Sequence, residues 1–142
     1  MGCTNLQSVS LPQGITRIGN NAFEECKKLE EIELPEGITE IGTLAFGGCR
    51  SLKKIIFPDG IEVFGNDFIN ACRNLEEVSI GSGAKEIGSF IPENTPKLTQ
   101  ISFRGSEEEW NSIKFYNPDN FANITILFEG QEKETDTSGS MD

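Results

Sequence analysis

Apolar and polar residues alternate in short stretches along this chain. In the segment LEEIELPEGITEIGTLAFGGCRS (29–51), the letters IEL alternate as in a half-buried strand, and a Pro-x-Gly turn follows. ITEI then predicts a second, shorter extended piece, after which Gly42 is expected to allow a sharp bend. The stretch AFGGC is expected to cross back as a turn or two of helix. Each such segment therefore predicts two short strands and one crossover.

The same pattern returns every 23 residues, as LQSVSLPQGITRIGNNAFEECKK before this segment and LKKIIFPDGIEVFGNDFINACRN after it. Three sets of equivalent positions show the period: Leu6, Leu29, Leu52, Leu75 and Leu98; Val9, Ile32, Ile55, Val78 and Ile101; and Cys3, Cys26, Cys49 and Cys72. A fixed period of this length is typical of a solenoid, in which stacked units bury what one unit alone would expose. The sequence predicts four to five coils with parallel strands about 4.8 Å apart.

The end of the pattern predicts a cap over the last coil. Ser106 with Glu109 three residues later is typical of a helix N-terminal capping box, and Trp110 and Ile113 follow on one helical face. We expect these two side chains and Phe115 to cover the core, and residues 124–128 to add a closing strand. The predicted organisation is coils in 1–105, with a truncated first coil, a cap in 106–128 and a disordered acidic tail in 129–142.

These repeats resemble the BspA-like leucine-rich repeat family. The motif L-x-x-[IV]-x-[LF]-P-x-G-[IV]-x-x-[IF]-G-x-x-A-F-x-x-C carries the resemblance at 6–26 and 29–49. Later copies depart from it, with Phe68-Ile69 and then Ile91-Pro92 in place of Ala-Phe, and Thr95 in place of Cys. The resemblance implies a right-handed, mostly β solenoid with short helical or irregular crossovers. It also implies a cell-surface or secreted protein that binds extracellular host proteins, glycans or other cells.

Composition narrows the possible functions. The 142 residues carry a net charge of −11, which disfavours binding to nucleic acid or to anionic membrane surfaces. No run approaches the roughly 18 apolar residues of a transmembrane helix, and no signal-peptide pattern is visible at the start. Histidine is absent, which removes catalytic triads, Cys-His dyads and His-ligated zinc hydrolases. No cofactor and no metal is expected, and the chain is expected to be a monomer.

The cysteine row has two interpretations, as chemistry or as packing. A zinc site needs thiols that converge, usually from a C-x2-C pair, whereas a spacing of 23 places them in a line. In-register parallel side chains also keep Cβ atoms about as far apart as the strands, beyond usual disulfide spacing. We therefore interpret the cysteines as small, buried, reduced side chains that fill the core beside the phenylalanines.

Carboxylates are the only catalytic candidates. The acidic stretches Glu30-Glu31, Glu76-Glu77 and Glu107–Glu109 could in principle supply the pair of acids of a glycosidase. They occupy ordinary repeat or cap positions, and no cluster interrupts the repeat to build a cleft. A polysaccharide-active enzyme is therefore the less favoured alternative.

The outward strand positions are the candidates for partner binding. Side chains on either side of the inward Val/Ile position point away from the core. Most are polar, but Ile56 and Val63 are apolar where other copies are polar. The predicted partner-binding residues are Glu31, Glu33, Lys54, Ile56, Val63, Glu77 and Ser79. The sequence thus favours a non-catalytic protein-binding or adhesion module with a protein or glycan ligand, and an intracellular interaction scaffold is the first alternative.

Overall fold

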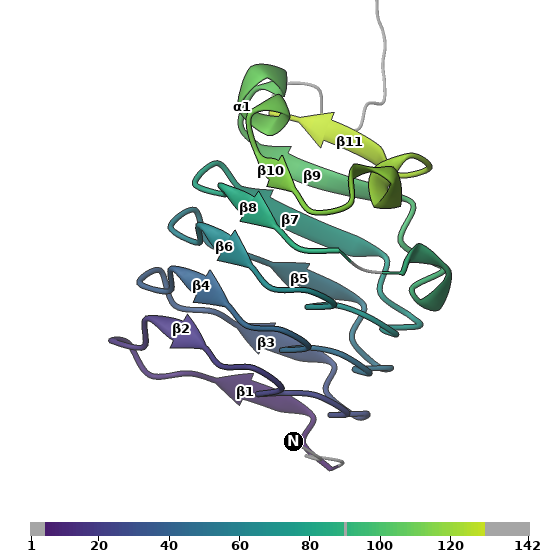
Figure 1. Cartoon of the computed structure of the whole chain (residues 1–142). Helices are drawn as coiled ribbons and strands as arrows, with labels where there is room; N and C mark the ends of the chain where they lie inside the picture. Colours follow the sequence, from purple (N-terminus) through teal and green to yellow (C-terminus); the bar gives the residue numbers. More distant parts are fainter. Residues whose placement is uncertain (1–4, 90, 130–142) are drawn as a thin grey trace, which may run out of the picture.

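The computed structural model describes residues 5–89 and 91–129, which form a single stack of coils with the first coil at one end and the cap at the other (Figure 1). Each coil gives one strand to each of two parallel sheets. The first sheet holds β1 (Ser8–Ser10), β3 (Glu31–Glu33), β5 (Lys54–Ile56), β7 (Glu77–Gly81), β9 (Gln100–Arg104) and β11 (Thr125–Phe128). The second sheet holds β2 (Arg17–Ile18), β4 (Glu40–Ile41), β6 (Val63–Phe64), β8 (Glu86–Ile87) and β10 (Lys114–Phe115).

The strands pair in the register that the sequence predicts. Val9 lies beside Ile32 and Ile55 beside Val78, so each residue meets its equivalent 23 positions away. The second sheet is one continuous ladder, whereas the first sheet is divided between β3 and β5 into two separate ladders. The prediction of a parallel, mostly β solenoid with a 23-residue unit is confirmed.

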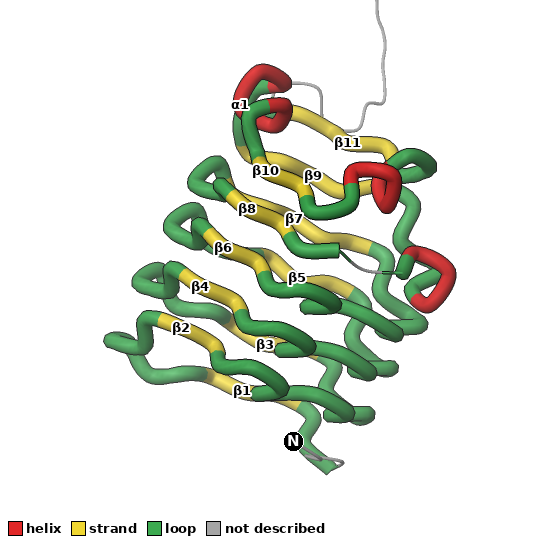
Figure 2. The backbone as a smooth tube through the Cα atoms, in the orientation of Figure 1, coloured by secondary structure: helices red, strands yellow, loops and turns green. Residues whose placement is uncertain are grey.

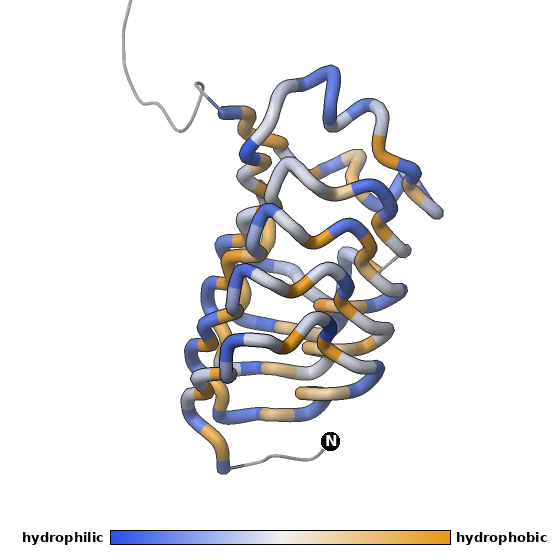
Figure 3. The backbone as a smooth tube through the Cα atoms, turned by 90° about the vertical axis from the view of Figure 1, so that its left-hand side faces the viewer, coloured by the Kyte–Doolittle hydropathy of each residue, from blue (hydrophilic) through white to orange (hydrophobic). Residues whose placement is uncertain are grey.

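The core fills the space between the two sheets with equivalent side chains on top of one another. Leu29, Leu52 and Leu75 have no exposed surface. Phe57 lies at the centre, with its ring centroid 5.1 Å from Phe64 and 5.7 Å from Phe68. Figure 3 shows apolar positions recurring at the same places in successive coils. A continuous core of this kind explains why one repeat would not fold alone.

The crossovers are tight turns, so the expected turn or two of helix is wrong for most of them. In the described part of the chain, helix is confined to α1 (Glu107–Asn111), the 3-10 turn η1 (Pro92–Asn94) and the 3-10 turn η2 (Pro118–Phe121), as Figure 2 shows. The reason is a pair of left-handed residues in each earlier crossover, which a right-handed helix cannot contain. The two sets recur with the 23-residue period: Asn21, Leu44 and Asp67 with φ of 62°, 57° and 57°, and Glu25, Gly48 and Ala71 with φ of 63°, 75° and 61°.

The glycines after the second-sheet strands have a different role from the predicted one. Gly42, Gly65 and Gly88 do not adopt positive φ. A Cβ atom on Gly65 would lie 2.5 Å from the backbone nitrogen of Thr43 in the preceding coil, and one on Gly42 would lie 2.6 Å from that of Asn20. Glycine is required here because two coils approach closely, and a sharp bend is not the reason.

The C-terminal segment closes the stack by extending both sheets. The capping box of α1 is confirmed: the Glu109 amide donates to Ser106 Oγ at 3.1 Å, and the Ser106 amide donates to Glu109 Oε1 at 2.8 Å. Trp110 packs on Phe103 and Phe115, with ring centroids 5.2 and 5.0 Å away. β10 pairs with β8, and β11 pairs with β9 as the predicted closing strand. The domain limits stay a prediction, and nearly all of the predicted tail, 130–142, lies outside the described residues.

Candidate protein-binding surface

The outward face of the first sheet carries the exposed side chains of the candidate surface. On β5, Lys54 and Ile56 flank the buried Ile55, because successive side chains of a strand point to opposite faces. Ile56 keeps 50% of its surface exposed, and Ser79, its neighbour in register on β7, is polar. An apolar side chain is therefore presented to solvent among polar ones.

A hollow lies beside Ile56, where the first sheet is divided between β3 and β5. We call it the Ile56 hollow, and its volume is about 520 Å³. Its apolar lining comes from Ile32, Leu34, Ile56 and Pro58. A second, smaller hollow of about 250 Å³ lies on the other side of Ile56, over β5, β7 and β9. Ile56 thus stands between two concavities of the same face.

Arg104 forms one wall of the Ile56 hollow and ties three coils together. Its Nε atom donates to Asp59 Oδ1 at 3.1 Å, and its guanidinium also donates to Ser79 Oγ and to the backbone oxygen of Phe57. Ser79 lies on β7, and Phe57 and Asp59 follow β5, whereas Arg104 ends β9. The side chain is therefore held in place by hydrogen bonds to charged and neutral acceptors.

Gly81 leaves the space through which the Arg104 side chain extends to Asp59. It lies beside Arg104 in the ladder between β7 and β9. A Cβ atom at Gly81 would lie 2.5 Å from Asp59 Oδ1 and 2.9 Å from Arg104 Nη2. Any side chain at this position would therefore collide with the ion pair. The repeat motif signals the site indirectly, because Gly81 and Arg104 stand where the earlier copies have Pro.

The structure brings together six of the seven predicted partner-binding residues. Glu31, Glu33, Lys54, Ile56, Glu77 and Ser79 all lie on the first sheet. Val63 lies on β6 of the second sheet, half-buried between Glu40 and Glu86 in register, and so does not share the face of Ile56. Lys54 lies 3.9 Å from Glu77, and among the described residues it forms no ion pair with Glu31.

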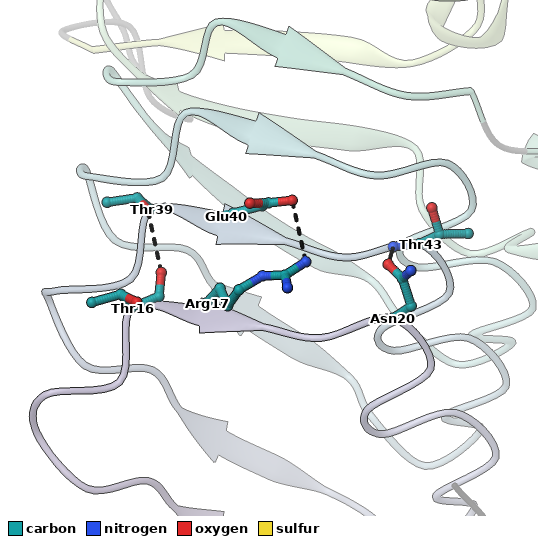
Figure 4. Close-up of polar contacts among 6 residues, drawn as sticks. All are labelled: Thr16, Arg17, Asn20, Thr39, Glu40 and Thr43. Atoms are coloured by element: carbon teal, nitrogen blue, oxygen red, sulfur yellow. Dashed lines mark hydrogen bonds and ion pairs between the residues drawn. The ribbon is translucent and has the colours of Figure 1, made fainter.

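The second sheet presents a polar ladder that joins one coil to the next (Figure 4). Arg17 pairs with Glu40 at 3.4 Å, and Asn20 Oδ1 accepts a hydrogen bond from the Thr43 amide at 2.9 Å. Asn66 does the same for the Ser89 amide at 3.0 Å. The asparagine side chains therefore accept hydrogen bonds from backbone amides of the following coil. Their positions in the sequence alone do not predict this role.

The cysteines lie in the core and donate hydrogen bonds to the preceding coil. Cys49 Sγ lies 3.2 Å from the oxygen of Phe23, and Cys72 Sγ lies 3.0 Å from that of Phe46. Thr95, which replaces Cys in the next copy, donates equivalently to the oxygen of Ile69 at 3.1 Å and is buried. The Cys72 thiol and burial together raise the pKa of the Cys49 thiol. These residues are donors inside the core, and Cys3 lies outside the described residues.

We predict that the buried thiols are unreactive in the native protein. Cys26, Cys49 and Cys72 are not joined in disulfides and have no exposed surface, and thiol reagents attack the exposed thiolate. Titration with a chromogenic disulfide reagent at pH 8 should label these three only after denaturant is added. Rapid labelling of all three in the folded protein would contradict the packing interpretation. Cys3→Ser serves as the background, because it removes the fourth thiol.

The remaining chemical candidates do not form a cleft. Glu30 and Glu31 line a shallow hollow with polar and basic residues, and Glu109 is engaged in its capping box. Glu77 pairs with Lys54. Within 5–89 and 91–129, no three His, Cys, Asp or Glu side chains are placed to hold a metal ion. The same residues contain no helix with the length and apolar character needed to cross a bilayer.

Comparison with solved structures gives relatives of similar fold. The pneumococcal vaccine antigen PcpA is 28% identical with a TM-score of 0.68, over 87% of this chain and 36% of that protein. A leucine-rich cell-surface protein of Faecalibacterium prausnitzii is 30% identical with a TM-score of 0.62, over 75% of this chain and 34% of that protein. A leucine-rich repeat protein of T. pallidum is 28% identical with a TM-score of 0.69, over 99% of this chain and 62% of that protein. The chain thus spans about a third to three fifths of these proteins.

The repeats themselves decide the family. No curated protein matches the chain. The pattern described as the BspA type leucine-rich repeat region matches residues 1–124, in six copies. Leucine-rich repeat domains of this type are generally protein-interaction modules. From its repeats and its coils alike, the chain belongs to the BspA-type leucine-rich repeat family.

Proposed function

We propose that this chain is a non-catalytic binding module of a cell-surface or secreted protein, and that it contacts a protein partner through the first sheet around Ile56. The half-exposed Ile56 between two hollows carries the proposal. An apolar centre inside a polar and charged rim is typical of protein interfaces. The similar solved structures include a vaccine antigen and a cell-surface protein, which supports the location.

An intracellular scaffold is the second candidate. The buried thiols of Cys26, Cys49 and Cys72 are not joined in disulfides, which favours it, because reduced cysteines are more usual in reducing compartments. Labelling of intact source cells with a membrane-impermeant biotin reagent distinguishes the two locations. Recovery of the protein in the biotinylated fraction or in the culture medium supports the surface or secreted assignment, and retention of unlabelled protein inside the cells supports the scaffold.

Replacing Ile56 with Glu should abolish most partner binding without unfolding the protein. The side chain is half exposed, so the change places a charge in solvent and leaves the core intact. We expect the melting temperature to stay nearly unchanged. Affinity for proteins retained from a panel of purified extracellular-matrix components should fall at least about tenfold, as for a central interface residue. Surface plasmon resonance on the retained component measures the effect.

A charge swap at Glu30 is the control. Glu30 is exposed beside β3, in the coil that precedes the coil of Ile56, and it does not line the Ile56 hollow. Glu30→Lys should change affinity much less than Ile56→Glu. Equal losses from both variants would indicate diffuse electrostatic attraction, and no loss from Ile56→Glu would remove this coil as the contact site.

A further inference from the structure

The charges around the Ile56 hollow are not balanced, once the contacts within the protein are considered. Two cations line it, and both are engaged: Lys54 lies 3.9 Å from Glu77, and Arg104 lies 3.0 Å from Asp59. Arg104 also donates from its two terminal nitrogens to Ser79 Oγ and to the backbone oxygen of Phe57. The arginine in this hollow is therefore a structural clamp and is not offered to an anionic ligand.

The acids on the β3 side of the hollow form no ion pair with any described residue. Glu33 and Glu36 line the hollow and are exposed, and Glu31 precedes them on β3. Among the described residues, none of these three carboxylates forms an ion pair. The charge that remains for a partner is therefore negative, and it lies beside an apolar surface.

The residues that line the Ile56 hollow favour a peptide over a sugar as its ligand. None of the described residues that line the hollow is aromatic, so no ring is available for a sugar to stack on. The aliphatic surface of Ile32, Leu34 and Ile56 suits a branched or aliphatic side chain instead. A volume of about 520 Å³ accommodates one or two such side chains.

We propose that the Ile56 hollow binds an extended, basic peptide segment of the partner protein. An apolar side chain of this segment contacts Ile56 and Leu34, and a neighbouring Lys or Arg faces Glu33 and Glu36. This inference rests on the proposed function, since it specifies the chemistry of the partner at the same surface. It follows from charge complementarity between the free acids and the segment, together with the apolar floor between them.

A selection from a random displayed peptide library tests the proposal. The wild-type chain is the bait, and Ile56→Glu is used in parallel to remove peptides that bind elsewhere. Selected peptides should combine Lys or Arg with an aliphatic residue within a few positions. The strongest peptide, made synthetically, should bind at least tenfold more weakly to Ile56→Glu in isothermal titration calorimetry. Its affinity should also fall several-fold between 50 and 300 mM salt, on the order expected for exposed ion pairs.

The matched control separates local from overall charge. The double variant Glu33→Gln/Glu36→Gln should weaken the peptide about three- to tenfold. Glu107→Gln/Glu108→Gln removes the same charge from exposed positions of α1 and should leave affinity within about twofold. Equal effects of the two double variants, or selected peptides that are acidic or lack basic residues, would overturn the proposal while leaving Ile56 as a contact. If no selected peptide depended on Ile56, the proposal would be overturned as well. If Ile56→Glu left binding to the matrix proteins unchanged, the proposed function itself would be overturned.

Discussion

Replacing Trp110 with Ala should lower the free energy of unfolding by about 3–5 kcal/mol, the range for removing a large buried aromatic side chain. Trp110 is 7% exposed and contacts the rings of Phe103, Phe115 and Phe121 at 5.0–5.8 Å. Its loss would leave a cavity between the last coil and the closing strands. Urea denaturation followed by circular dichroism measures the change, which is a large fraction of the roughly 5–15 kcal/mol that stabilises a typical domain.

Tyr116→Ala is the matched control, since it removes an aromatic ring from the same cap. Tyr116 is 55% exposed, and its contacts are a hydrogen bond to Glu86 and the nearby Lys114 ammonium. The expected loss is about 1 kcal/mol or less, as for an exposed pair. If Trp110→Ala kept wild-type stability and only weakened partner binding, Trp110 would belong to the binding surface.

Replacing Gly65 with Ala should destabilise the protein by about 3 kcal/mol, at the upper end for added atoms in a packed site. The new methyl group would lie 2.5 Å from the Thr43 nitrogen and 2.7 Å from the Gly42 carbonyl carbon. Both are backbone atoms that cannot rotate away, so the second and third coils must separate locally. The hydrogen bond from the Gly65 amide to the Ile41 oxygen, 2.8 Å long, would weaken as well.

Gly19→Ala tests the same substitution at the equivalent position without the neighbour. No described atom lies within 4 Å of a Cβ atom built there, and Gly19 does not adopt positive φ. This variant should be neutral or stabilised by about 0.5 kcal/mol, because Ala restricts the unfolded chain. Comparable destabilisation by both substitutions in thermal unfolding would show that backbone freedom, and not the approach of two coils, fixes glycine at this position.

The sequence predicted the features that repetition makes visible. The 23-residue spacing of leucines and β-branched residues predicted the register of both sheets, and it did so because parallel stacking places equal residues side by side. The capping box at Ser106 was predicted because its two hydrogen bonds are local, within three residues. Local signals and repeated signals therefore sufficed for the fold.

The turns of the crossovers could not be predicted in the same way. Leu44 and Ala71 adopt left-handed conformations that their side chains disfavour, at a cost of about 1–2 kcal/mol each. A backbone hydrogen bond to the next coil holds Leu44 there, from its amide to the Asn66 oxygen at 3.0 Å. Contacts between coils thus override the preference of these residues for right-handed backbone conformations, and no local sequence pattern predicts such contacts.

The candidate surface was only partly visible for a related reason. Ile56 departs from the polar residues of its ladder, so the sequence could single it out. The Arg104 clamp depends on Asp59, Ser79 and Gly81 from the two preceding coils, and it breaks the repeat instead of following it. Val63 also departs from its ladder, but the turn after β5 places it on the other sheet.

The direction of the bonds between coils determines how the protein responds to mechanical load. The first coil and the cap lie at opposite ends of the stack, so tension between the ends pulls along the backbone hydrogen bonds that join neighbouring strands (Figure 1). Such bonds break one after another, and the first coil, whose Val9 and Phe23 are only half-buried, separates before the capped end. Each coil that opens releases 23 residues, or about 75–80 Å of extended chain. A domain held at both ends therefore lengthens in steps as successive coils open.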